Sequence, residues 1–403
     1  MNFMLYFDMV QTVAFAAVLL FLGSYLVRRI SFLNKYNIPA PVVGGLIFAF
    51  VNWGLQSVEI GLRFDTTFQD PFMIAFFTTI GMGASIRMLK EGGSKLVTFL
   101  LVASVLLVLQ NLVAWGLSIV TGLDPLIGLL AGSITMSGGH GTGATFANYF
   151  TEQFHTVGAM EVAMAAATFG LVSGSLIGGP VARRLILKKN LKSSGAEVDD
   201  MKPLEADIAA IEHAPIGRDD VLAAILQLTV CMGIGAVLYA FFARRGITVP
   251  TYLFSLFIGI VVRNVSDATG IYKVNMRLVD TIGSVALSLF LAMALMSLKL
   301  WQLVELALPM LVILSGEVVL MILYATFVTF TFNGRDYDAA VLAGGHCGFG
   351  LGATPNAIAN MQAITDKYGP APRALFLVSI VGAFFIDIVN AVVIQTFVSF
   401  MQH

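Results

Sequence analysis

Charge is scarce in this sequence of 403 residues. Asp, Glu, Lys and Arg together make up 12% of the chain, whereas hydrophobic residues make up 58%. A water-soluble protein carries about twice that share of charged residues, so the composition excludes an ordinary soluble domain and indicates a polytopic membrane protein. The formal net charge of −1 offers no basic surface to a polyanion, and no nucleic-acid partner is expected.

Cysteine is nearly absent as well. Cys231 and Cys347 each lie in an apolar segment, which is typical of small buried residues and not of a disulfide framework. His140 and His346 share no standard ligand spacing with them, so no transition-metal site is predicted. The N-terminus has no basic region before its first apolar stretch, which predicts a retained membrane helix and not a cleaved signal peptide.

Long apolar runs, in contrast, are abundant. A membrane-spanning helix needs about 20 apolar residues, and ten segments come near that length. They are residues 11–27, 39–57, 71–86, 96–120, 161–182, 219–243, 249–264, 281–298, 303–330 and 374–398. The charged segment 186–218 predicts a solvated cytoplasmic linker, which divides the chain into halves of five spans each, residues 1–185 and 219–403.

The two halves share a motif. The sequence GHGTGAT at 139–145 is echoed by GFGLGAT at 348–354, and their starts are 348 − 139 = 209 residues apart. Alternate glycines disfavour a membrane helix. The segments 126–150 and 338–362 are therefore expected to be re-entrant hairpins with the backbone broken at these motifs, a feature that points to the binding site of a secondary transporter.

An odd number of spans per half implies that the halves have opposite orientations in the membrane, as in an inverted repeat. With both termini on the periplasmic side, four of the 23 Lys and Arg residues lie outside, and the remaining 19 lie inside. The four are Arg63, Arg244, Arg245 and Lys299. The positive-inside rule favours this topology. The hairpins then enter from opposite sides, and their tips are expected to meet near the membrane midplane.

The chemistry of the tips predicts the ligands. Helix N-termini within the membrane suit carboxylates, and carbonyl or hydroxyl oxygens suit Na⁺. The predicted substrate-binding residues are Ser137, Gly138, Gly139, His140, Gly141, Thr142, Gly143, Gly348, Gly350, Gly352, Thr354 and Asn356. The residues predicted to bind Na⁺ are Ser133, Thr135, Asn360, Asp387 and Asn390. Asp387 is included because a carboxylate within a span is a functional candidate by default.

Other interpretations stay open at this stage. The glycine motifs could serve only close helix packing, and Asp387 could make only a structural hydrogen bond. Glu317 is a second intramembrane carboxylate with a weaker case. Arg263 could hold a substrate carboxylate or anchor its span at the cytoplasmic face. Ser137 with His140 could suggest an intramembrane enzyme, but no acid is placed to orient that histidine.

Five stretches carry a resemblance to a known family. They are SGGHGTGA at 137–144, GHCGFGLGATP at 345–355, IANMQAI at 358–364, LSLFLAMALM at 287–296 and GAFFIDIVNA at 382–391. Together they resemble the bacterial sodium/glutamate symporter family. The resemblance implies Na⁺-driven uptake of L-glutamate across the inner membrane, two inverted five-helix repeats with opposed hairpins, a homodimer and elevator-type movement. Symport of another dicarboxylate or of citrate is the alternative within this class.

Overall fold

The computed structural model describes residues 3–193, 216–245, 250–296, 298 and 301–401. A helix lies in each of the ten ranges that the sequence predicts. In the first half they are α1 (Met9–Arg29), α3 (Ala40–Ser57), α4 (Gln69–Gly83), α6 (Gly93–Thr121) and α9 (Ala159–Lys189). In the second half they are α11 (Arg218–Ala243), α12 (Thr251–Thr269), α13 (Met276–Leu295), α14 (Trp301–Tyr324) and the pair α18 (Pro372–Ile380) and α19 (Ile386–Met401).

Shorter elements join or extend these helices. The helices α2 (Ser31–Lys35) and α5 (Ile86–Glu91) lie in connections, and the π-helical turns η3 (Ala325–Thr329) and η4 (Val381–Phe385) continue α14 into α15 (Phe330–Phe332) and α18 into α19. In the expected linker, residues 186–189 still belong to α9, and residues 194–215 lie outside the described residues.

The chain is a membrane protein by the length and apolar character of its helices. Six described helical stretches are long and apolar enough to cross a bilayer: α1, α6, α9, α11, α13 and Leu306–Phe332. Other described helices in the predicted ranges are shorter or less apolar, among them α4 with 15 residues. Length and composition alone therefore support at least six spans.

Local sequence signals explain where the helices begin and end. The Asp8 carboxylate accepts a hydrogen bond from the backbone N–H of Gln11 at 2.8 Å, and the Gln11 side chain accepts one from the Asp8 N–H at 3.0 Å. This capping box starts α1. Gly122, with φ of 73°, ends α6 in the left-handed conformation, and Pro250 precedes α12. Such positions favour glycine and proline respectively.

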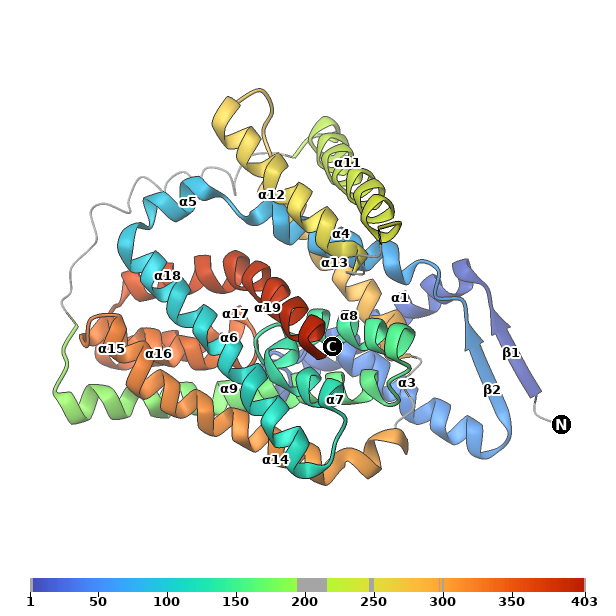
Figure 1. Cartoon of the computed structure of the whole chain (residues 1–403), viewed down its shortest axis with the longest axis horizontal. Helices are drawn as coiled ribbons and strands as arrows, with labels where there is room; N and C mark the ends of the chain where they lie inside the picture. The colour runs from blue at the N-terminus through green and yellow to red at the C-terminus, as the bar shows by residue number, and fades with distance from the viewer. Residues whose placement is uncertain (1–2, 194–215, 246–249, 297, 299–300, 402–403) are drawn as a thin grey trace.

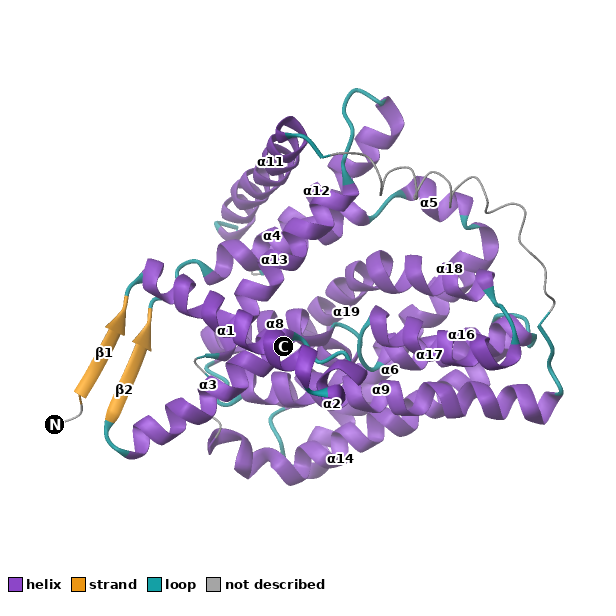
Figure 2. Ribbon diagram, turned by 180° about the vertical axis from the view of Figure 1, so that it is seen from behind, coloured by secondary structure: helices purple, strands orange, loops and turns teal. Residues whose placement is uncertain are grey.

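The prediction of an all-helical fold is confirmed apart from one small sheet. Phe3–Phe7 (β1) and Ile60–Phe64 (β2) pair in parallel as a two-stranded sheet at the edge of the molecule (Figure 2). Phe7 and Phe64 stack with ring centroids 4.9 Å apart, and Phe15 of α1 packs against Phe48 of α3 at 4.8 Å. Aromatic residues have high strand propensity, and here Phe64 also packs against Phe15 and Phe48, with ring centroids 5.8 Å apart in each case, which joins the sheet to α1 and α3.

The helices form two groups (Figure 1). In one, α4 packs against α12 and α13, α11 packs against α12, and α1 packs against α3 and α13. In the other, α6, α9 and α14 pack around the two hairpins. Close approach depends on glycine, since a Cβ atom on Gly81 of α4 would lie 2.0 Å from the carbonyl oxygen of Leu256 in α12. Because α6, α9 and α14 pack around them, the hairpins belong to the second group, and they face the first.

Candidate functional site

The two glycine-rich segments form helical hairpins. The first consists of α7 (Pro125–Leu129) and the π-helical turn η1 (Leu130–Ile134), followed by α8 (Gly139–Phe154). The second consists of α16 (Tyr337–Gly350) and α17 (Thr354–Tyr368). We call residues 137–139 the first tip and residues 351–353 the second tip, since the chain turns there.

The expectation that the glycine motifs interrupt the helices is confirmed for the second motif, whose residues 351–353 form the turn, and is wrong for the first, whose residues 139–145 all lie in α8. Gly139 begins α8, whose first turns contain Gly141 and Gly143, and α16 continues to Gly350. Each glycine costs about 1 kcal/mol within a helix, but it permits close packing. A Cβ atom on Gly348 would lie 2.5 Å from backbone atoms of Ala357 in the facing helix α17. The packing of helix against helix therefore offsets the poor propensity.

The two tips touch, as the sequence predicts. The Gln110 side-chain amide of α6 donates to the carbonyl oxygen of Gly350 at 2.7 Å. The Ser137 hydroxyl lies 2.7 Å from Gln110 Oε1 and 3.2 Å from the same Gly350 oxygen. A Cβ atom on Gly139 would be 3.4 Å from the carbonyl oxygen of Gly352. One buried glutamine thus connects the tip of each hairpin.

A cavity of about 870 Å³ lies at the tips. Its wall on one side includes Ser137 to Gly141 and Gly352 to Pro355, so the N-terminal ends of α8 and α17 both reach it. On the other side it is lined by polar residues of α1, its following connection and α13, namely Ser24, Asn34, Asn37, Ser284 and Ser288. The cavity therefore lies between the two helix groups.

The charge of this cavity is unusual. Among the described residues that line it, Asp387 carries the one formal charge, and there is no Lys or Arg. Positive potential at the wall comes from backbone. The first N–H groups of a helix have no partner within the helix, and its N-terminus carries the equivalent of about half a positive charge. Two such ends meet here, so the cavity is suited to anionic groups.

The predicted substrate residues divide into two sets. Seven of the twelve line the cavity: Ser137, Gly138, Gly139, His140, Gly141, Gly352 and Thr354. The other five pack behind the tips: Thr142, Gly143, Gly348, Gly350 and Asn356. The Asn356 side-chain amide donates to the carbonyl oxygen of Leu171 at 3.0 Å and to the Ser175 hydroxyl at 2.8 Å. It holds the second hairpin against α9.

His140 also has a defined partner. Its Nε2 lies 3.0 Å from the Thr168 hydroxyl oxygen in α9, and that hydroxyl donates to the carbonyl oxygen of Met164 at 2.8 Å. Because the Thr168 hydroxyl already donates its hydrogen to the Met164 carbonyl oxygen, the Nε2–H of His140 is the donor in the bond to Thr168. The histidine therefore fixes the start of α8 against α9 while it borders the cavity.

The residues predicted to bind Na⁺ are not all in one place. Asp387 lines the cavity, whereas Asn390 is buried and donates from its side-chain amide to the carbonyl oxygen of Ser133 at 2.9 Å. The Ser133 hydroxyl and the Asn390 side-chain oxygen are buried with no hydrogen-bond partner among the described residues. Thr135 donates to the carbonyl oxygen of Leu130 at 2.6 Å, and Asn360 donates to that of Gly174 at 2.9 Å.

Sequence reasoning missed two neighbouring residues of α6. Gln110 joins the tips, and the Asn111 side-chain oxygen accepts from the backbone N–H of Ser133 at 2.9 Å. Both are fully buried. The sequence does show two consecutive amide side chains in the middle of an apolar span. A polar side chain there needs a partner inside the protein, which marks both residues as candidates.

Known proteins similar to this chain decide its family. The family model described as sodium/glutamate symporter matches residues 5–370. The sodium/glutamate symporter of Escherichia coli strain K12 is 48% identical over 399 residues, which is 98% of each chain. That of Haemophilus influenzae is 44% identical over 96% of each chain. The chain belongs to the sodium/glutamate symporter family.

A solved structure is also similar, at a lower level. It is a sodium/proton antiporter of Methanocaldococcus jannaschii, with a TM-score of 0.47 and 16% identity over 97% of each chain.

The family is one of transporters and not of enzymes, and the geometry of the candidate nucleophile agrees with this. Ser137 interacts with Gln110 and Gly350, whereas His140 interacts with Thr168.

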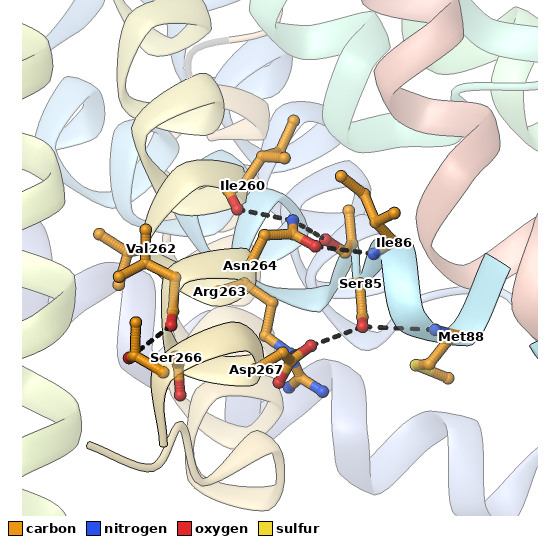
Figure 3. Close-up of polar contacts among 12 residues, drawn as sticks. Ser85, Ile86, Met88, Ile260, Val262, Arg263, Asn264, Ser266 and Asp267 are labelled. Carbon is orange, nitrogen blue, oxygen red and sulfur yellow. Dashed lines mark hydrogen bonds and ion pairs between the residues drawn. The ribbon is translucent and has the colours of Figure 1, made fainter. Parts of the chain in front are cut away.

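Arg263 has a partner on its own helix (Figure 3). Its Nε lies 3.0 Å from the Asp267 carboxylate, to which the Ser85 hydroxyl donates at 2.5 Å. Next to them, Asn264 bonds the backbone on both sides of Ser85, at Ile86 N–H and at the Ala84 carbonyl. This network joins α12 to the end of α4, and Arg263 lies outside the described lining of the cavity.

Glu317 remains without an assignment. It is fully buried in α14, and both carboxylate oxygens have no hydrogen-bond partner among the described residues. It does not belong to the described lining of the cavity.

Proposed function

We propose that this protein carries L-glutamate into the cell together with Na⁺ across the bacterial inner membrane. The membership of the family supports the substrate and the ion, since the relatives are named sodium/glutamate symporters. The observation that carries the proposal is the meeting of two helix N-termini at one cavity. A dicarboxylate needs two anion sites, and the tips offer two without a basic side chain.

The donors at the two tips differ. At the first tip, the backbone N–H groups of the first turn of α8, among them those of Gly139 and His140, have no partner within the helix. At the second tip, Pro355 has no N–H, and the N–H of Asn356 donates to the carbonyl oxygen of Ala353 at 3.0 Å. Thr354 is then the main donor there, through its N–H and hydroxyl. The proposed substrate-binding set is the seven cavity-lining residues, with Thr142, Gly143, Gly348, Gly350 and Asn356 holding the tips.

Na⁺ is proposed to bind behind the first tip. The Ser133 hydroxyl and the Asn390 side-chain oxygen are both buried without a partner among the described residues, and the Asn390 amide donates to the carbonyl oxygen of Ser133. Hydroxyl, amide and carbonyl oxygens are the ligands that a hard cation prefers. Thr135 and Asn360 belong to the same proposal at the two hairpins. The membrane potential adds about 2.3 kcal/mol per charge per 100 mV to the driving force.

An inverted repeat is the architecture that we propose, with domains 1–185 and 219–403 joined by the cytoplasmic linker 186–218. Corresponding close contacts support it. A Cβ atom on Gly23 of α1 would meet the backbone nitrogen of Gly44 in α3 at 2.9 Å, and one on Gly235 of α11 would meet the Ser255 side chain in α12 at 2.1 Å. Gly44 and Ser255 follow the prolines that precede their helices, Pro39 and Pro250, at the same distance in sequence. These pairs occupy corresponding places in the two halves. Ten spans and two opposed hairpins follow from this arrangement.

An elevator-type movement fits the two helix groups. Both tips belong to the group of α6, α9 and α14, while the opposite wall of the cavity comes mainly from α1 and α13. Sliding one group against the other would move the bound substrate with its Na⁺. The cavity reaches Asn34 and Asn37, which the proposed topology places near the cytoplasm. The homodimer is predicted from the family resemblance alone.

Uptake by the purified protein in proteoliposomes tests the function. An inward Na⁺ gradient should drive accumulation of labelled L-glutamate, and replacement of Na⁺ by K⁺ should abolish it. Succinate and citrate at equal concentration should compete weakly. Accumulation of succinate or citrate in place of glutamate would favour the other dicarboxylate or citrate symporter, and uptake independent of Na⁺ would refute symport.

The topology makes a separate prediction. Single cysteines introduced at Gln153, at the end of α8, and at Lys367, at the end of α17, should react with an impermeant maleimide from opposite sides of the membrane. Both positions are exposed, and the native Cys231 and Cys347 are buried and should give little background. Labelling of both introduced cysteines from one side would contradict the inverted repeat.

A further inference from the structure

We propose that Asp387 binds the α-ammonium group of the substrate and so makes the transporter select an amino acid over a plain dicarboxylate. The inference rests on the proposed function and deepens it. The sequence alone suggested Asp387 as a Na⁺ ligand, but its place on the cavity wall favours the substrate. The two assignments predict different results for the same variant.

The position of Asp387 is next to the second tip. It lies in the first turn of α19, directly after the π-helical turn η4. Gly382 of η4 also lines the cavity, and a Cβ atom there would be 3.1 Å from the Thr354 hydroxyl at the start of α17. The carboxylate therefore faces the same space as the N-terminus that is proposed to hold a substrate carboxylate.

The two helix N-termini leave one group of the substrate without a partner. Glutamate carries two carboxylates and one ammonium, and the two helix N-termini can take the carboxylates. The ammonium has three N–H donors and needs acceptors, with a negative charge as the best of them. Among the described lining residues, Asp387 alone supplies that charge.

Asp387 in turn lacks a partner in the protein. No hydrogen bond or ion pair joins it to any of the described residues. A carboxylate in a membrane protein is costly unless a cation or donors meet it. Asn390, one turn further along α19, faces Ser133 instead of the cavity. The helix thus presents a negative charge to the substrate and an amide to the proposed Na⁺ site.

Charge balance explains why Na⁺ would still be needed. Glutamate contributes −1 and Asp387 another −1, while two helix N-termini supply the equivalent of about +1. The occupied cavity therefore lacks about one positive charge, which a Na⁺ ion behind the first tip would provide. Binding of Na⁺ and glutamate should then be cooperative.

Glutarate is the probe, because it has the carbon chain and both carboxylates of glutamate but no ammonium. Binding of L-glutamate and of glutarate at saturating Na⁺ is measured by calorimetry on the purified protein and on Asp387→Asn. The wild type should bind glutamate at least about 30-fold more tightly than glutarate, as expected for a buried charge pair. In Asp387→Asn the ratio should fall to about threefold or less, through weaker glutamate binding.

The control is Asp366→Asn, which makes the same change at an exposed position of the hairpin helix α17. It should keep the wild-type ratio. A wild-type ratio in folded Asp387→Asn overturns the inference, and so does an unchanged ratio with a higher Na⁺ concentration for half-maximal binding, which would assign Asp387 to the ion.

The experiments distinguish failure of the proposed function from failure of the inference on Asp387. If the wild type does not take up glutamate with Na⁺, the proposed function fails. If it does so but Asp387→Asn keeps its discrimination, only the inference fails. Should Asp387→Asn not fold, the wild type alone decides: equal binding of glutarate and glutamate would show that no group recognises the ammonium and would overturn the inference.

Discussion

Replacing Gly170 by alanine should lower Na⁺-driven glutamate uptake by about fivefold or more, and Gly170→Val should bring it to background. Gly170 lies in α9 beneath both tips. A Cβ atom there would be 2.2 Å from the carbonyl oxygen of Leu351 in the second tip and 3.3 Å from the Met136 side chain beside the first. The first of these contacts involves backbone, so the tip must shift.

The size of the effect follows from the cost of overpacking. Extra carbon atoms in a packed interior cost about 1–3 kcal/mol, which lowers the population of the correctly placed tip by about 5- to 150-fold. Uptake into proteoliposomes is the measurement, with the amount of reconstituted protein determined in parallel. The thermal unfolding temperature should fall by only a few degrees, because the tip and not the whole bundle is displaced.

Gly179→Ala is the matched control on the same helix. A Cβ atom there would meet nothing within 4 Å, so uptake should stay near that of the wild type. Equal loss in both variants would indicate a general need for glycine in α9. Normal uptake by Gly170→Ala would show that the second tip need not lie where the structure has it.

The sequence predicted the helices and the tips well, for physical reasons. Membrane spans need long apolar runs, so ten ranges could be predicted, and each contains a helix, six of them with a stretch long and apolar enough to cross a bilayer. The repeated glycine motif identified two hairpins whose tips are in contact. Charge also helped, since the sparse intramembrane carboxylates included Asp387, which lies at the cavity.

What the sequence could not predict depends on partners distant in the chain. Alternate glycines have poor helix propensity, yet α8 and α16 are helical there because facing backbones pack closely. Residues 3–7 and 60–64 pair as strands although they are far apart in the chain, and local strand propensity does not say which segments pair. The wall of the cavity opposite the tips includes Asn37 and Ser284, which lie outside every motif quoted from the sequence. Only tertiary structure brings these residues to the site.

Gln110 should be among the residues most sensitive to substitution, although it carries no charge. Its amide nitrogen donates to the carbonyl oxygen of Gly350, and its oxygen lies 2.7 Å from the Ser137 hydroxyl. Gln110→Glu keeps the shape but replaces the donor with a carboxylate oxygen that faces a carbonyl oxygen. Because the site is fully buried, the unpaired charge is costly. Uptake should fall to background, with a lower unfolding temperature.

Gln110→Leu and Ser137→Ala remove the hydrogen bonds between the tips without burying a charge. Each should weaken uptake, and a double-mutant cycle on stability should give a coupling energy of about 1 kcal/mol, since one buried hydrogen bond joins them. Ser104→Ala on the same helix is the control, because that hydroxyl donates only within α6, to Leu100 at 2.7 Å. If Gln110 connects the tips, the double variant should transport little less than Gln110→Leu alone. Strictly additive losses, with no coupling energy, would mean that Gln110 and Ser137 act independently and that the tips are held together by packing.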